Sequence, residues 1–70
     1  MPLSLAPLNT ELEVIKMLLE EKEKKHLESL GITIGSKLQI LDSSNGNLIV
    51  LVKNGRLALD KIVATKILVR

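Results

Sequence analysis

The chain has 70 residues, of which 46% are hydrophobic and 26% are charged, and its formal net charge is +2. This size and composition fit one folded domain over residues 1–70 and exclude both a disordered segment and two independent cores. There is no Cys, Phe, Tyr or Trp, which excludes disulfides, thiolate metal sites and the aromatic platforms that stack nucleic-acid bases or bind proline-rich peptides.

The N-terminal segment is short and apolar. Leu3 and Leu5 flank Ser4, and this alternation predicts a short strand. Pro7 has a fixed φ, so we expect a turn over residues 6–10. The segment lacks the positively charged stretch with which a signal peptide begins. No part of the chain has the roughly 20 consecutive apolar residues that span a bilayer. We therefore expect a cytoplasmic protein without an export signal or a transmembrane segment.

A second strand is predicted over residues 11–17. Polar and apolar side chains alternate from Glu11 to Val14, with the polar residues at odd positions. The next polar residue, Lys16, is at an even position, which in a regular strand would face the opposite side. One extra residue in a strand changes the parity in this way. The sequence therefore predicts a β-bulge near Val14 and Ile15.

A helix of about three turns is predicted over residues 20–30, which are rich in Glu, Lys and Leu. We expect His26, Leu27 and Leu30 to mark its inner edge. Gly31 follows at the position where a helix often ends in a left-handed conformation, which glycine adopts without steric cost. The helix is therefore predicted to end at this glycine.

Two strands and a hairpin turn are predicted after the helix. Gly35 marks a turn, and residues 37–41 then alternate apolar and polar side chains, as in a strand. Residues 42–47 form a polar turn, in which Asn45-Gly46 is a strong hairpin signal. Residues 48–52 are all apolar, which predicts a strand that is covered on both faces.

The C-terminal segment completes the predicted sheet. Asn54-Gly55 predicts a second hairpin turn and residues 56–59 a short strand. Asp60 is expected to cap a single helical turn that ends at Ala64, and residues 66–69 form the final strand. The predicted fold is mainly β: a small, strongly bent barrel of about five strands with one inserted α-helix.

The reactive side chains of this chain do not form a catalytic or metal-binding pattern. His26 is the single histidine, and Glu23 lies three residues before it, but no second histidine or paired carboxylate completes a metal site. For Ser29, Ser43 and Ser44, His26 is the sole possible base of its kind, and no nucleophile-elbow motif surrounds any of these serines. We therefore predict no catalytic residue, no metal ligand and no cofactor, and expect that the protein is not an enzyme.

The excess of aliphatic residues is the feature that best indicates a function. In several predicted strands, large aliphatic side chains occupy both the odd and the even positions. Because alternate side chains of a strand point to opposite faces, one of these two sets should face outward. Either the helix and the N-terminal strand cover this set, or it forms an interaction surface. The residues predicted for a partner-binding surface are Met17, Leu18, Leu41, Ile49, Leu51 and Leu68.

Four motifs in a fixed order resemble the FeoA (ferrous iron transport A) family of SH3-like domains over nearly the whole chain. They are Leu27-Glu28-Ser29-Leu30-Gly31, Gly35, Gly55-Arg56-Leu57-Ala58-Leu59 and Ile67-Leu68-Val69. The resemblance implies an SH3-like barrel and a non-enzymatic role in ion transport, in a family associated with transition metal ion binding. It also implies the membrane ferrous iron transporter FeoB as the partner, which would place the chain at the inner membrane through that contact.

Two other functions remain open at this point. One is a regulatory module of the type found in metal-dependent repressors, and the other is a self-associating domain that forms a weak homo-oligomer. The small net charge and the glutamates interleaved with Lys22–Lys25 argue against nucleic acid as a partner, because a phosphate-binding surface needs clustered positive charge.

Overall fold

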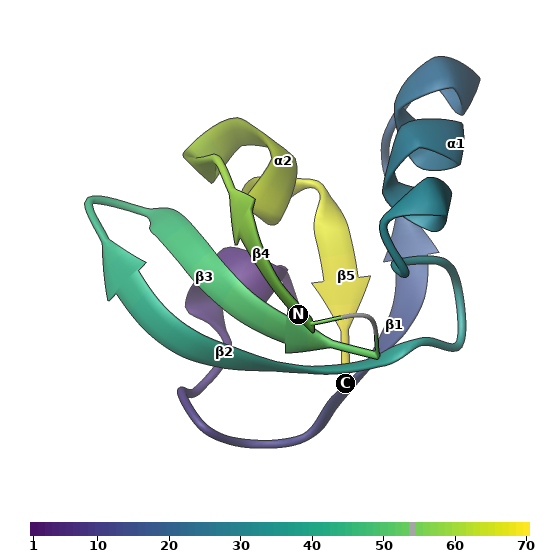
Figure 1. Ribbon diagram of the computed structural model, residues 1–70. Helices are drawn as coiled ribbons and strands as arrows, with labels where there is room; N and C mark the ends of the chain where they lie inside the picture. Colours follow the sequence, from purple (N-terminus) through teal and green to yellow (C-terminus); the bar gives the residue numbers. More distant parts are fainter. Residues whose placement is uncertain (54) are drawn as a thin grey trace.

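The computed structural model describes residues 1–53 and 55–70 (Figure 1). It confirms the mainly-β prediction with an inserted helix, which has 9 residues and therefore about two and a half turns. The elements are a 3₁₀ helix η1 (Leu3–Leu5), β1 (Leu12–Met17), α1 (Glu21–Ser29), β2 (Lys37–Ser44), β3 (Asn47–Val52), β4 (Gly55–Leu59), α2 (Lys61–Thr65) and β5 (Ile67–Val69).

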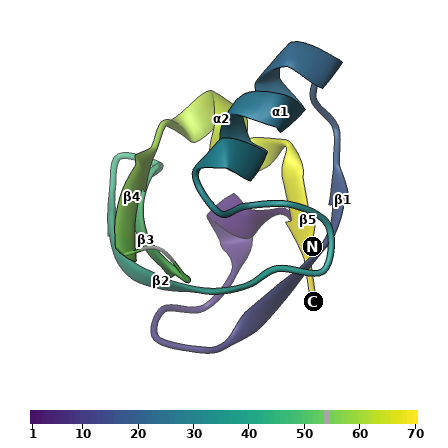
Figure 2. The same ribbon diagram turned by 45° about the vertical axis from the view of Figure 1, so that its right-hand side comes forward.

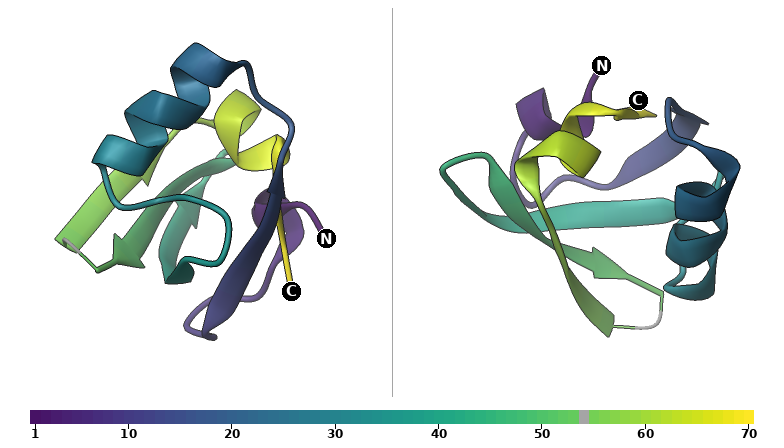
Figure 3. Two further views of the ribbon diagram at one scale, coloured as in Figure 1. Left: turned by 90° about the vertical axis from the view of Figure 1, so that its right-hand side faces the viewer. Right: turned by 90° about the horizontal axis from the view of Figure 1, so that it is seen from above.

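One antiparallel sheet in the order β4-β3-β2-β1-β5 curls into a small barrel (Figure 2). The N-terminal segment covers the outer edge of β5, because the N–H of Val69 donates to the carbonyl of Met1 at 2.7 Å. The helix α1 stands at one side of the barrel, next to β1 (Figures 1 and 3). In the view from above, η1 and α2 lie on the concave side of β2, β3 and β4 and α1 lies at the side, so the convex side of these strands is left uncovered (Figure 3).

The interior is one aliphatic cluster. Its most completely buried large side chains come from η1, the loop after α1 and four strands: Leu3, Val14, Ile32, Ile40, Val50, Ile67 and Val69. In the described residues, no polar or charged side chain is buried. The stability of the fold therefore comes from aliphatic burial and backbone pairing.

The predicted strand at Leu3–Leu5 is wrong, because these residues form η1. The N–H of Leu5 donates to the carbonyl of Pro2 at 3.0 Å, which closes a helical turn. Leu3 is buried, whereas Leu5 is 74% exposed. Three residues with apolar ends fit a strand and a helical turn equally well, so the sequence pattern could not separate them.

The predicted end of α1 is confirmed by a Schellman motif. The N–H of Ile32 donates to the carbonyl of Leu27 at 2.9 Å, and the N–H of Gly31 donates to the carbonyl of Glu28 at 3.0 Å. Gly31 has a φ of 99°, as the left-handed end requires. Leu27 and Ile32, the positions that often make a hydrophobic contact in this motif, are both buried in the core cluster.

The bulge predicted in β1 is also confirmed. The register of β1 against β5 shifts between Val14 and Lys16, so Ile15 is the extra residue. The predicted cap of α2 is present too, because Oδ1 of Asp60 accepts a hydrogen bond from the N–H of Val63 at 2.8 Å.

The β2–β3 turn is shorter than predicted. β2 continues to Ser44, so only Asn45 and Gly46 form the turn, with φ values of 55° and 86°. These two positive values are typical of a type I′ hairpin, which confirms the Asn45-Gly46 signal. Polar residues 42–44 belong to the strand because backbone pairing does not depend on apolar side chains. The four glycines predicted for turns all have positive φ: Gly31, Gly35, Gly46 and Gly55.

The prediction that both faces of residues 48–52 are covered is wrong. Leu48, Val50 and Val52 are buried, whereas Ile49 and Leu51 are 38% and 40% exposed. α2 lies on the concave side of the curled sheet and α1 lies beside it, so neither helix reaches the convex face (Figure 3). The second predicted turn includes Asn54, which lies outside the described residues. In the described part of the chain, no helix is long and apolar enough to span a membrane.

Candidate functional site

The convex side of the sheet carries the candidate interaction surface, which we call the outer face. Its aliphatic centre consists of Ile49 and Leu51 on β3. Leu41 on β2 is half-buried and Ala58 on β4 is exposed. Because partner residues of antiparallel strands point to the same side of a sheet, the strand register places the other members of this face: Gln39, Asp42 and Arg56.

The register arranges the outer face in two rows across the strands. In the first row, Ile49 lies between Asp42 on β2 and Ala58 on β4. In the second row, Leu51 lies between a glutamine on β2 and Arg56 on β4. An acidic and a basic side chain therefore occupy opposite corners around an aliphatic centre.

A bulge in β2 adds one further aliphatic side chain to this surface. The register of β2 against β3 shifts between Ile40 and Asp42, so Leu41 and Asp42 both lie opposite Ile49. In such a bulge, two successive side chains sit opposite one residue of the partner strand. Ile40 remains buried in the core, and Leu41 lies beside Ile49 on the outer face.

The structure brings together only half of the residues predicted for partner binding. Leu41, Ile49 and Leu51 share the outer face, but Met17, Leu18 and Leu68 belong to the β1–β5 end of the sheet. Met17 is only 5% exposed and packs in the core, so it cannot contribute to a surface. Leu18 is exposed after β1, and Leu68 is half-buried on β5.

Sequence reasoning did not find Gln39, Asp42, Arg56 and Ala58 as members of the outer face. Their membership depends on the register between β2, β3 and β4 and on the bulge at Leu41. The Asn45-Gly46 signal, which sets the β2–β3 register next to the turn, could have predicted the polar neighbours near the turn but not those beyond the bulge.

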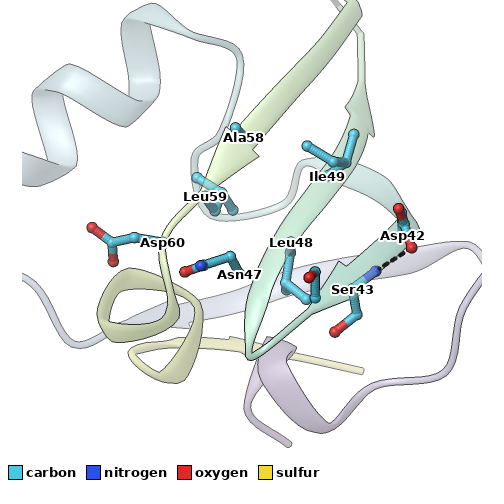
Figure 4. A pocket seen from close by; sticks show the side chains of 9 residues that line it. Asp42, Ser43, Asn47, Leu48, Ile49, Ala58, Leu59 and Asp60 are labelled. Carbon is cyan, nitrogen blue, oxygen red and sulfur yellow. Dashed lines mark hydrogen bonds between the residues drawn. The ribbon is translucent and has the colours of Figure 1, made fainter.

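An open pocket of about 530 Å³ adjoins the outer face at the end of β2, β3 and β4 (Figure 4). Three of its polar side chains each accept a hydrogen bond from a backbone N–H group of the fold. Oδ1 of Asp42 accepts from the N–H of Ser43 at 2.8 Å, and Oδ1 of Asn47 accepts from the N–H of Lys61 at 2.9 Å. The hydrogen bond from Val63 occupies Oδ1 of Asp60 in the same way. These groups stabilise the turn and the start of α2, and they do not converge on a ligand.

His26 is exposed on α1, so the prediction that it lies at the inner edge of the helix is wrong. Leu27 takes the buried position because one residue along a helix turns the side chain by about 100°. His26 and Glu23 line a cleft between α1 and Val63 of α2. Among the described residues, no group of three or more His, Cys, Asp or Glu side chains gathers to hold a metal ion.

Comparisons with known proteins show which family and which solved structures this chain is similar to. The model of the FeoA domain matches residues 1–70. The chain is similar to a crystal structure of an iron uptake regulatory protein (FeoA), with 32% identity over 99% of this chain and 92% of that chain and a TM-score of 0.85. It is also similar to FeoA from Chlorobium tepidum, with 25% identity over 100% of this chain and 69% of that chain and a TM-score of 0.89.

A third similar structure is FeoA from Stenotrophomonas maltophilia complexed with zinc, which is described as a procaryotic SH3 domain protein. The identity is 25% over 100% of this chain and 89% of that chain, and the TM-score is 0.74. This likeness confirms the prediction of an SH3-like barrel. No curated protein matches the chain.

Proposed function

Because this chain belongs to the FeoA family, we propose that it is a non-enzymatic accessory protein of bacterial ferrous iron uptake that binds the cytoplasmic part of the FeoB transporter. The description of the S. maltophilia relative, which raises a role as a bacterial ferrous iron transport activating factor, supports the transport context. The protein then acts in the cytoplasm and reaches the inner membrane through its partner.

The proposal that this protein acts by binding a partner rests on the exposed aliphatic side chains of the outer face. Ile49 and Leu51 are exposed side by side on β3, on a side of the sheet that neither helix covers. Exposed aliphatic side chains that lie next to each other favour an interaction surface. A partner that covers the outer face removes both aliphatic side chains from water, which favours association.

Binding can activate the transporter only if this protein prefers one conformation of it. A ligand shifts a conformational equilibrium by its difference in affinity for the two states. The proposed action is therefore a conformational bias, produced when the outer face docks on a surface that differs between transporter states.

A binding measurement with the purified cytoplasmic domain of the transporter tests this function. We expect association at micromolar concentration and a loss of at least about tenfold in affinity for Ile49→Asp, since a buried unpaired charge opposes docking. Leu5→Asp is the matched control, because Leu5 is 74% exposed on η1, away from the outer face. No association in any nucleotide state, or equal losses for the two variants, would contradict the proposal.

A further inference from the structure

The two charged side chains of the outer face are arranged for self-complementarity. Asp42 lies beside Ile49 on the β2 side, and Arg56 lies beside Leu51 on the β4 side. Both are exposed. The three ion pairs found among the described residues use other side chains, so neither charge is neutralised by such a pair within residues 1–53 and 55–70.

A two-fold axis can exchange these two corners. The axis lies in the plane of the outer face, crosses β3 between Ile49 and Leu51, and runs at right angles to the line from Asp42 to Arg56. When this axis generates a second copy, Arg56 of the second copy faces Asp42 of the first, and Asp42 of the second copy faces Arg56 of the first. We propose that the outer face pairs with the outer face of a second copy of this chain, as in other symmetric interfaces that use the same patch twice.

The side chains of the outer face favour a second copy of this chain as the binding partner. At the centre, Ile49 and Leu51 of each copy meet the same aliphatic side chains of the other and lose contact with water. At the rim, two pairs of opposite charge fix the orientation and register more than they add affinity. The aliphatic centre is small, so the dimer is weak and its population depends on protein concentration.

Self-pairing and transporter binding would use the same surface and therefore exclude each other. The self-pairing does not depend on the proposed function, because it needs only this chain. If both occur, a dimer hides the outer face until dilution or a tighter partner separates the copies.

Charge reversal combined with sedimentation at increasing protein concentration tests the pairing. We expect the wild-type chain to show a concentration-dependent dimer. Arg56→Asp places two carboxylates together at each rim contact, so the dimer dissociation constant should rise at least about tenfold. Asp42→Arg should do the same by placing two guanidinium groups together. The double variant Asp42→Arg/Arg56→Asp restores opposite charges and should return the dissociation constant toward that of the wild type.

Two further variants separate this pairing from general effects on folding. Ile49→Asp should abolish the dimer, and Leu5→Asp should leave it unchanged, with circular dichroism as the check that each variant is folded. A wild-type chain that stays monomeric at all concentrations overturns the proposal. It is also overturned if the double reversal dimerises no better than the weaker single variant.

Discussion

The side chain of Asn47 caps the first turn of α2: its Oδ1 accepts a hydrogen bond from the backbone N–H of Lys61 at 2.9 Å. These residues are 14 positions apart, and the bond ties the β2–β3 hairpin to the helix that follows β4. Together with the Asp60 cap, it satisfies two N–H groups that the helix itself cannot pair. The hairpin end of the outer face is therefore held by a contact that is distant in sequence.

Replacing Asn47 should weaken this connection. We expect Asn47→Ala to lower the free energy of unfolding by about 1 kcal/mol, as for other lost helix caps. Asn47→Asp keeps an acceptor oxygen and adds a negative charge near the N-terminus of α2, so it should be less destabilising. Urea unfolding measures both. Equal losses for the two variants would mean that the hydrogen bond is not the stabilising feature.

The left-handed end of α1 should not tolerate a β-branched residue. Gly31 has a φ of 99°, so we expect Gly31→Val to cost at least about 1–2 kcal/mol. Gly31→Asn should be milder, because asparagine enters this conformation more readily. Thermal or urea unfolding measures the difference. An unchanged midpoint for the valine variant would show that the helix ends in another conformation.

The two sides of the sheet should respond differently to the loss of one methyl group. Ile67 is fully buried in β5, and Ile49 is 38% exposed on the outer face. We expect Ile67→Val to lower the free energy of unfolding by about 0.5–1.5 kcal/mol and Ile49→Val by less. Measurement in dilute solution keeps self-association out of the comparison. A larger loss at Ile49 would contradict the assignment of that side chain to the exterior.

The ion pairs at the chain end should contribute little stability. A carboxylate oxygen of Glu13 lies 3.7 Å from Nζ of Lys37 and 3.3 Å from Nε of Arg70, but both basic side chains are well exposed. We expect Glu13→Gln to cost about 0.2–1 kcal/mol and the loss to shrink at high salt, because exposed charges are screened. Unfolding in low and high salt gives this comparison, and a salt-independent loss above that range would argue for a structural role of the carboxylate.

The backbone pairing beside these ion pairs explains why that small effect is expected. The N–H of Glu13 donates to the carbonyl of Arg70 at 2.9 Å, and the N–H of Arg70 donates back to the carbonyl of Glu13 at 3.0 Å. These two hydrogen bonds remain in Glu13→Gln, so the sheet keeps its pairing.

Local signals predicted the elements that depend on a few neighbouring residues. The helix end at Gly31, the hairpin turn at Asn45-Gly46 and the cap at Asp60 each follow from the conformation or hydrogen bonding of one or two residues. The β1 bulge followed from a change of parity within one strand. Such features need no knowledge of the distant chain, because their physical cause lies within a few residues.

The errors occurred where the answer depended on distant contacts. The pattern of Leu3–Leu5 fitted both a strand and a helical turn. In the structure, these residues form the helical turn η1, which packs against α2 and β5. Residues 48–52 were apolar at every position, so the sequence could not show whether a helix covers their second side. Met17 and Leu18 are neighbours in sequence, yet one lies in the core and the other in water.

A small aliphatic barrel without thiol or aromatic chemistry and with turns at its glycines follows from composition and local conformation, because neither depends on tertiary contacts. Which aliphatic side chains remain outside depends on the folded sheet. The curl of the sheet encloses the side of β3 that carries Val50 and leaves Ile49 and Leu51 outside. The register of three strands sets Asp42 and Arg56 at the corners around these two exposed residues. That arrangement depends on which strands pair, which is a property of the whole fold.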